Sequence, residues 1–474
     1  MRNYLLFIGF LLYNLTIAQE KVTSFNIGLK KKSTLFEIVD SKSKELLLYN
    51  REPGITTVLK TNYKFEVIDS VYFETPNNMI FTNYLGHSKK EENYSVYWSN
   101  NKRDSIFYQQ INFNNKELKS KTIILDSIEN NLLESIAIGS NFYMITIGKN
   151  ENSLTFHQFN EGEYQKKVIS FEGENFYHSK DKSSNSIWDV FNDGYVGVQT
   201  ITEDNIVSLT RTAILKKLYV FNDKEIVFTF DGNAFFTQIL KINMDNFSYT
   251  IQNCEKYTTS TNDEFKKLPK TNSFICNDKI FQIIVSSEAV TIDIKNFKFE
   301  TLKSYSINKD KEIDFINSEV FQENYKITNK RALDKTSQFI YRLKNLYMGL
   351  TCQFVNNTYQ LKFGAYSSVE NPMMYGAMGG LVGALVVAAL SPSYSSQSIN
   401  SYSGRQVVYT NSILDENFNH IKENLVVPTF DKLRQFSIDN STLQNQMVFK
   451  FDKTTYFAGY DKKTKLMSFY KFND

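Results

Sequence analysis

The feature that most constrains the fold is a short segment of alternating apolar and polar residues that recurs along this chain of 474 residues. Such alternation has the two-residue period of a pleated strand, so each segment predicts a β-strand. Turn residues separate the segments, for example Glu161-Gly162 and Asp231-Gly232-Asn233. Asp-Gly between two such segments is a strong signal for a β-hairpin. Clear predicted strands are Leu154–Phe159, Tyr164–Phe171, Glu225–Phe230, Ala234–Ile242, Ile280–Val285, Ala289–Ile294 and Leu466–Phe472.

Polar turns followed by an aromatic residue or Leu mark one hairpin of each repeat. The residues that follow these turns are Leu118, Tyr164, Phe247, Phe297 and Phe418. Consecutive markers lie roughly 45–55 residues apart, or about twice the shorter of these distances where one is missed. Periods of this size indicate a repeat architecture, and four strands per repeat match the blade of a propeller.

By this repeat pattern the chain resembles the β-propellers as a fold class, without a motif of any particular family. The resemblance predicts an all-β protein in which residues 22–474 form one β-propeller of seven or eight four-stranded blades. Two β-sandwich domains are the alternative architecture. Parallel-sheet folds are disfavoured, because amphipathic helices of about 10–15 residues do not alternate with the strands.

An uncharged stretch rich in Gly, Ala, Val, Leu and Met interrupts the pattern between the predicted strands Tyr359–Ser367 and Arg405–Ile413. This Gly-rich insertion, residues 369–404, belongs to a late blade. Its small residues recur at a four-residue spacing, which places them on one face of a helix. A face of small residues lets another backbone approach closely. The predicted docking residues are Gly376, Gly379, Gly380, Gly383, Ala384, Ala388, Leu381 and Leu385.

Three roles for the insertion stay open on the sequence alone: packing against its own domain, docking into a partner protein, and contact with a bilayer. A single membrane crossing is disfavoured, because it would place strands of one propeller on opposite sides of the membrane. The part from Ser391 to Ser403 is rich in Ser, Tyr and Asn and predicts a flexible return to the blade.

The beginning of the chain predicts export. Arg2 precedes the apolar run 5–12, and Thr16-Ile17-Ala18 fits a small-residue cleavage site, so residues 1–18 have the pattern of a signal peptide. The mature chain would then begin at Gln19. We expect a protein that is periplasmic or peripheral to the outer membrane, with secretion as the second choice.

Charge and rare residues limit the possible functions. The chain has 54 basic and 51 acidic residues, which gives no electrostatic case for binding nucleic acid. Its three cysteines, Cys254, Cys276 and Cys352, show no metal-ligand or catalytic spacing. A disulfide between Cys254 and Cys276 and buried free thiols remain alternatives. We expect no metal site, no cofactor and no catalytic residue.

The densest polar cluster is a possible ligand loop formed by His178, Asp181, Trp188, Asp189 and Asp193. Two carboxylates beside an aromatic side chain are the elements of a carbohydrate-active site. A solvated loop that leads into a strand is the simpler interpretation of the same residues.

The expected function is therefore that of a non-enzymatic envelope protein, an interaction or accessory subunit. It would dock through its Gly-rich insertion onto a membrane protein or a membrane surface, for example at an outer-membrane transport or secretion channel. The alternative is a glycan- or peptide-active or glycan-binding propeller that uses the loop from Asp181 to Asp193. The sequence does not identify a small-molecule ligand.

Overall fold

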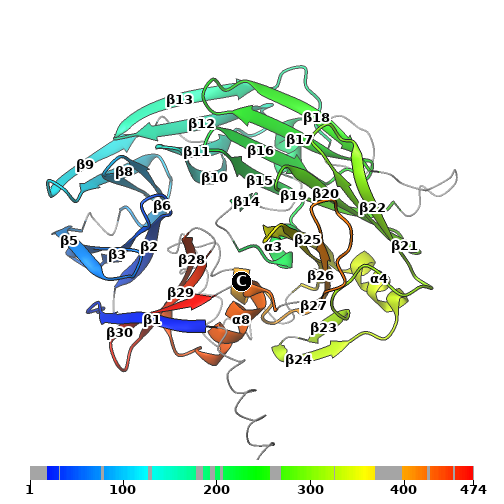
Figure 1. The fold of residues 1–474 in the computed structure, drawn as a ribbon. Helices are drawn as coiled ribbons and strands as arrows, with labels where there is room; N and C mark the ends of the chain where they lie inside the picture. Colours follow the sequence, from blue (N-terminus) through cyan, green and yellow to red (C-terminus); the bar gives the residue numbers. More distant parts are fainter. Residues whose placement is uncertain are drawn as a thin grey trace, which may run out of the picture.

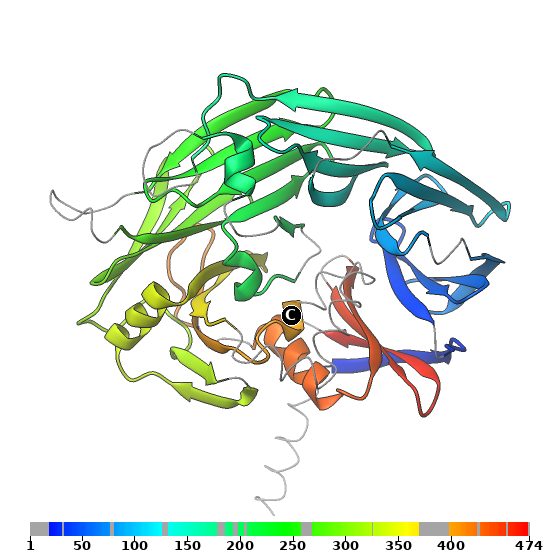
Figure 2. The same cartoon turned by 180° about the vertical axis from the view of Figure 1, so that it is seen from behind.

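The computed structural model describes residues 19–472 except 31–32, 76–79, 126–130, 178–184, 193–197, 203–205, 257–267, 325, 369–397, 424–426 and 452–453. The strands form seven sheets of four or five strands, which stand around a central axis like the blades of a propeller (Figures 1 and 2). The predicted all-β propeller is confirmed, and the number of blades is seven.

The first three blades each have four antiparallel strands, which follow one another from the axis outward. Blade 1 consists of β2 (Thr34–Asp40), β3 (Glu45–Arg51), β4 (Ile55–Thr61) and β5 (Val67–Glu74). Blade 2 consists of β6 (Asn83–Lys90), β7 (Asn93–Ser99), β8 (Ser105–Asn112) and β9 (Glu117–Ile124). Blade 3 consists of β10 (Asn131–Ile138), β11 (Asn141–Ile147), β12 (Ser153–Asn160) and β13 (Glu163–Ser170).

Blade 4 departs from this plan, because its innermost strand runs parallel to the next one. It consists of β14 (Gln199–Ile201), β15 (Lys216–Phe221), β16 (Glu225–Phe230), β17 (Phe236–Asn243) and β18 (Tyr249–Glu255). The short helix α3 (Leu209–Thr212) connects β14 to β15, and α2 (Ile187–Phe191) precedes β14. Blade 5 is regular, with β19 (Lys270–Cys276), β20 (Lys279–Val285), β21 (Ala289–Lys295) and β22 (Thr301–Asn308).

Blade 6 is assembled out of chain order. From the axis outward its strands are β25 (Tyr347–Val355), β26 (Thr358–Tyr366), β27 (Gln406–Leu414), β23 (Phe321–Asn324) and β24 (Lys326–Ala332). The hairpin of β23 and β24 comes first in the sequence but forms the outer edge of the blade. The three inner strands follow it in the sequence. Helix α4 (Thr336–Asn345) leads from this edge back to the axis (Figure 1).

Blade 7 closes the ring with strands from both ends of the chain. It contains β28 (Gln444–Phe451), β29 (Thr454–Asp461), β30 (Leu466–Phe472) and, outermost, β1 (Gln19–Asn26). β1 pairs antiparallel with β30, with Gln19 opposite Phe472. Helix α8 (Thr429–Asp439) connects blade 6 to this blade. The last predicted strand, Leu466–Phe472, is thus confirmed residue for residue.

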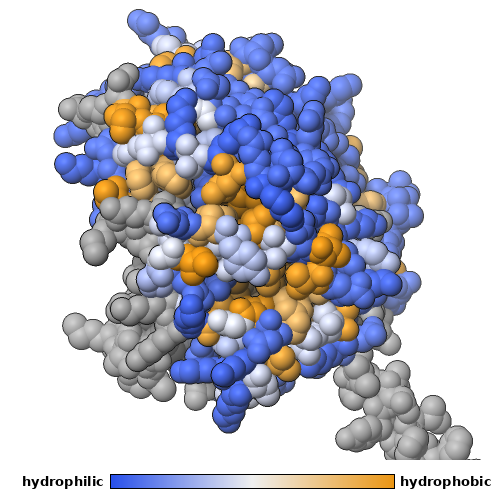
Figure 3. All heavy atoms as spheres, turned by 90° about the vertical axis from the view of Figure 1, so that its left-hand side faces the viewer, coloured by the Kyte–Doolittle hydropathy of each residue, from blue (hydrophilic) through white to orange (hydrophobic). Residues whose placement is uncertain are grey.

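The position of a strand in its blade decides how apolar it is. In β11, the second strand of blade 3, every residue from Phe142 to Ile147 is buried, because side chains of both neighbouring blades pack on it. The outermost strand β13 instead exposes most of its residues. Figure 3 shows the side of the molecule on which β5 lies, where apolar residues form patches among hydrophilic ones.

A five-residue turn with the sequence Asn-aromatic-Lys-Phe-Glu joins the last two strands of blades 1 and 5, at 62–66 and 296–300. Its Phe adopts a positive φ, 61° at Phe65 and 67° at Phe299, which is strained for a bulky residue. Burial offsets the strain: Phe65 is fully buried and stacks on Phe469 of blade 7 at a ring-centroid distance of 4.6 Å. Phe65 of this turn therefore packs blade 1 against blade 7.

Candidate functional site

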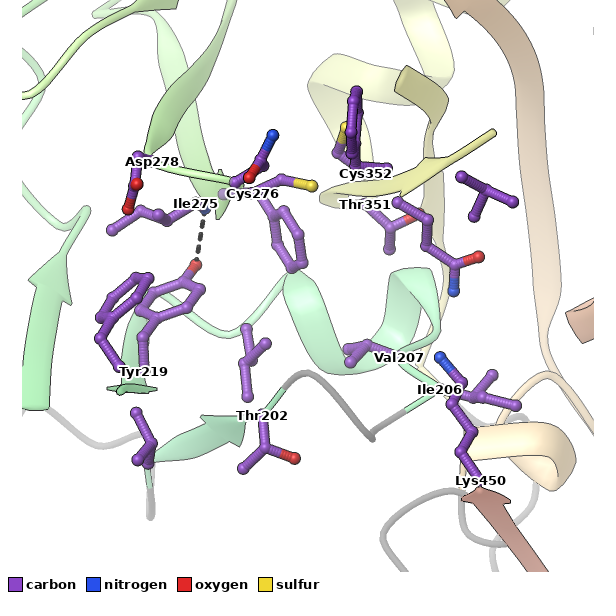
Figure 4. Close-up of a pocket in the computed structure, with 18 of the residues that line it drawn as sticks. Thr202, Ile206, Val207, Tyr219, Ile275, Cys276, Asp278, Thr351, Cys352 and Lys450 are labelled. Atoms are coloured by element: carbon purple, nitrogen blue, oxygen red, sulfur yellow. Dashed lines mark hydrogen bonds between the residues drawn. The ribbon is translucent and has the colours of Figure 1, made fainter. Parts of the chain in front are cut away.

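A cavity of about 520 Å³ lies at the propeller axis (Figure 4). Its wall is formed by the ends of β14 and β15 in blade 4, β19 in blade 5 and β25 in blade 6. Residues at the start of α8 and from β28 and β29 of blade 7 complete it. The lining residues come from the carboxyl ends of these inner strands and the turns that follow them, so the cavity belongs to that rim of the propeller.

The cavity wall mixes apolar and polar side chains in similar proportion. Apolar lining residues include Ile201, Ile206, Val207, Tyr219, Phe274 and Phe354. Polar ones include Thr202, Asn277, Asp278, Thr351, Gln353 and Lys450. Asp278 is the one carboxylate among the described lining residues, so they supply no carboxylate pair for acid–base hydrolysis. A wall of this kind suits a small ligand with an apolar body and a few polar groups.

The Tyr219 phenol on the cavity wall is fixed in place. Its oxygen accepts a hydrogen bond from the backbone N–H of Ile275 at 3.2 Å, which joins β15 to β19 (dashed line in Figure 4). Burial raises the pKa of Tyr219 well above its ordinary value, so the phenol stays protonated near neutral pH. Tyr219 is therefore suited to orienting a ligand and not to removing a proton from one.

Two of the three cysteines lie on the cavity wall. Cys276 ends β19 and Cys352 lies in β25, the neighbouring inner strand of blade 6 (Figure 4). Cys254 lies in the outer strand β18, and burial raises its pKa to about 11. All three thiols are free, so the structure contains no disulfide between Cys254 and Cys276. The cysteine that neighbours Cys276 is Cys352, a pairing that the sequence spacing did not indicate.

A fully buried charge cluster lies between blades 4 and 5, near the starts of β15 and β19. The Asp231 carboxylate lies 3.1 Å from the Lys217 ammonium and 3.7 Å from the Lys256 ammonium. Thr237 and Ser273 donate hydroxyl hydrogen bonds to the same carboxylate at 2.7 and 2.8 Å. Two cations share one anion, and burial lowers the pKa of Lys256 to about 8.

This cluster joins blade 4 to blade 5. Lys217 also donates to Asn272 at the inner edge of blade 5, at 2.6 Å. The sequence pattern places Asp231 in an ordinary hairpin turn and does not predict the cluster. One sequence feature could have indicated the cluster. The pair Lys216-Lys217 begins an otherwise apolar strand, and a Lys that is buried in such a strand needs a partner of opposite charge.

The possible ligand loop is described only in part, because His178, Asp181 and Asp193 lie outside the described residues. Trp188 lies in α2, is only 8% exposed and packs into the core between blades 3 and 4. The Asp189 carboxylate caps the same helix and accepts hydrogen bonds from the backbone and hydroxyl of Ser186. In this arrangement Trp188 presents no free face to a sugar, and the ligand loop stays a prediction.

The predicted docking residues Gly376, Gly379, Gly380, Leu381, Gly383, Ala384, Leu385 and Ala388 all lie outside the described residues. The two ends of the insertion are described. They leave β26 and enter β27, which pair with each other up to Tyr366 and Val407. The backbone N–H of Ser367 donates to the Gln406 carbonyl at 2.8 Å, and Arg405 donates to the Ser367 carbonyl at 3.1 Å. The insertion thus starts and ends at the closed tip of a β-hairpin.

The last residues of the insertion, 398–403, are packed, which corrects the prediction of a flexible return for this part. Residues 391–397 lie outside the described residues. Ile399 and Tyr402 are almost fully buried in a core cluster with α3 and α8. The Tyr402 hydroxyl accepts from the backbone N–H of Leu209 at 3.3 Å. A Ser- and Tyr-rich composition did not reveal this packing, because the aromatic ring finds its partners in distant parts of the chain.

Among the described residues, no group of three or more His, Cys, Asp or Glu side chains is arranged to hold a metal ion. No helix in the described part of the chain has both the length and the apolar character needed to span a membrane.

Comparisons with known proteins give no family. No family model matches the chain, and no curated protein matches it. Solved structures that resemble it include the uncharacterized protein lmo1340 from Listeria monocytogenes EGD-e, with a TM-score of 0.31, 9% identity and coverage of 72% of this chain and 82% of that one. One of two prolyl endopeptidases gives 0.33 at 7% identity, over 92% of this chain and 48% of that one. A mutant of Synechocystis apocarotenoid oxygenase gives 0.30 at 6% identity, over 60% and 64%. Similarities this weak carry no argument about function.

Proposed function

We propose that this protein is a non-enzymatic, exported interaction subunit of the cell envelope, and that it docks through its Gly-rich insertion onto a membrane protein or a membrane surface. One concrete form is an accessory subunit of an outer-membrane transport or secretion channel. The propeller would then be the rigid carrier and the insertion the docking element.

The observation that carries this proposal is the way the insertion is attached. It joins two strands that stay paired up to Tyr366 and Val407, and the hydrogen bonds of Ser367, Arg405 and Gln406 close the hairpin beneath it. A propeller blade needs no such segment, since a short turn at 355–358 connects the hairpin of β25 and β26 in the same blade. Long connections inside compact domains are uncommon, and functional binding loops are one of the usual reasons for them.

Export is supported by the sequence and is compatible with how the ring closes. The predicted cleavage site precedes Gln19, and Gln19 lies opposite Phe472 in the pair of β1 with β30. Cleavage there would leave the whole of β1 available to pair with β30 in blade 7. Intact-mass measurement of the protein recovered from its producing cells should give a chain that begins at Gln19, whereas an intact Met1 would contradict export.

Docking is tested with the mature protein and a variant in which residues 372–392 are replaced by a short Gly/Ser linker. Both are mixed with vesicles of envelope lipids and with proteoliposomes that carry envelope membrane proteins, and sedimented. The proposal expects the parent protein to co-sediment and the variant to stay in solution. Equal sedimentation of the two proteins, or none with either vesicle, would contradict it.

The axial cavity favours a second candidate function, the binding of a small ligand. Its volume of about 520 Å³ lies in the range of ligand pockets, and its wall is already formed. Replacing Thr351 by Trp would fill part of the cavity. A compound that raises the melting temperature of the parent protein, but not of Thr351→Trp, would identify this site, whereas equal shifts would place binding elsewhere.

A further inference from the structure

Cys276 and Cys352 face each other across the boundary between blades 5 and 6. They lie in β19 and β25, the innermost strands of these two blades, which pack side by side. In Figure 4 the Cys276 sulfur points toward the strand that carries Cys352. Both residues line the axial cavity, and both thiols are free. The two thiols also differ in access, since Cys352 is 4% exposed whereas Cys276 is partly exposed.

We propose that Cys276 and Cys352 are a redox pair that forms a reversible disulfide between blades 5 and 6, and that a small disulfide-containing oxidant reaches the pair through the axial cavity. The cellular compartment in which this reaction would occur depends on the proposed export, because disulfides form in oxidising compartments. The chemistry itself rests only on the two side chains and the cavity.

The order of the steps follows from the two environments. Cys276 loses its thiol proton to water, and its sulfur attacks one sulfur of the oxidant. The S–S bond of the oxidant breaks, the attacked half stays bound to Cys276 as a mixed disulfide, and the other half leaves as a thiol after taking up a proton. Cys352 then loses its proton and attacks the Cys276 sulfur, which releases the second half of the oxidant as another thiol. In sum, two protein thiols give up two protons and two electrons, and one disulfide of the oxidant is reduced to two thiols.

Cys276 is assigned the first attack because it is the more accessible thiol. Burial, together with the adjacent Cys276 thiol, raises the pKa of Cys352 well above its ordinary value, so Cys352 is the poorer nucleophile toward a reagent in solution. Within the mixed disulfide it needs no access to solvent, since its target sulfur lies beside it. A disulfide here would tie the chain at positions 276 and 352 and restrict the unfolded state.

The test uses the purified full-length mature protein, reduced and then incubated with oxidised glutathione. We expect the chain to lose the mass of two hydrogen atoms without a glutathione adduct, and digestion to yield one linked pair of peptides that contain Cys276 and Cys352. The melting temperature should rise by a few degrees, roughly 3–5 °C, and dithiothreitol should reverse the rise.

Cys254→Ser is the matched control and should still form the cross-link, because Cys254 lies in the outer strand β18. Cys276→Ser and Cys352→Ser should each lose it. If either variant fails to fold, peptide mapping of the oxidised parent protein alone decides whether Cys276 and Cys352 are cross-linked. A stable glutathione adduct on Cys276, a cross-link that includes Cys254, or no reaction would overturn the proposal. A cross-link that forms in vitro in a protein that cells keep in the cytosol would contradict export and leave the redox pair standing.

Discussion

The Lys42 ammonium lies 2.9 Å from the Asp223 carboxylate and thereby links two blades that are not neighbours in the ring. Lys42 is in the turn between β2 and β3 of blade 1, and Asp223 is in the turn between β15 and β16 of blade 4. Asn222, the residue before Asp223, lines the axial cavity. The ion pair therefore lies at the rim to which the cavity belongs.

Replacing Lys42 by Ala should barely change the stability of the ring. The two side chains are 86% and 53% exposed, and solvent-exposed ion pairs contribute about 0–1 kcal/mol. Thermal unfolding of Lys42→Ala should give a melting temperature close to that of the parent protein. A large decrease would mean that this contact, and not the packing between blades, holds the ring closed.

Replacing Phe65 by Ala should destabilise the protein strongly. Phe65 is fully buried between blades 1 and 7 and contacts the rings of Phe449, Phe451 and Phe469. Removal of a buried Phe side chain costs about 3–5 kcal/mol of unfolding free energy, and relief of the positive φ would not offset this loss because Ala is also strained there. Chemical denaturation measures the change.

Tyr63→Ala, in the same turn, is the control for Phe65→Ala. Tyr63 is 56% exposed, so its loss should change the unfolding free energy by less than about 0.5 kcal/mol. Equal losses of stability for the two substitutions would show that the turn stabilises the protein through its backbone and not through the packing of the Phe65 ring.

The buried charge cluster predicts an alkaline rise in stability. The folded-state pKa of Lys256 is about 8, below its ordinary 10.5, so the unfolded chain binds more protons between these values. Stability contributed by Lys256 therefore increases with pH across this window, by up to about 1.4 kcal/mol per pH unit. Lys256→Met should lose the part of this pH dependence that Lys256 contributes and keep the part from Lys217, whose pKa burial also lowers. Parallel pH profiles of the two proteins, measured by chemical denaturation, would contradict the assignment.

Local patterns predicted the blade strands well. Glu225–Phe230 and Leu466–Phe472 have the predicted bounds, because alternation and flanking turn residues define a strand within a few positions. The predicted hairpins of blades 3 and 5 are also present, with ends shifted by one or two residues. These features depend only on residues that are close together in the chain.

Contacts between distant segments could not be predicted in this way. The pairing of β23 with β27 brings Phe321 opposite Tyr409, and no local pattern distinguishes this from an ordinary hairpin. Three other features also depend on segments that lie far apart in the chain. They are the closure of blade 7 by β1, the burial of Tyr402 and the proximity of Cys276 to Cys352. The cavity forms only where several blades meet at the axis, so no single segment of the sequence predicts it.

The most direct test of the proposed docking function compares Gly380→Leu with the parent protein in two measurements, thermal unfolding and co-sedimentation with envelope proteoliposomes. A Leu side chain on the face of small residues that the sequence predicts would prevent close backbone approach to a partner. The proposal predicts an unchanged melting temperature and binding weakened by about tenfold or more, which corresponds to about 1.4 kcal/mol. A clear fall in melting temperature with unchanged binding would contradict it, because the insertion would then pack against its own propeller.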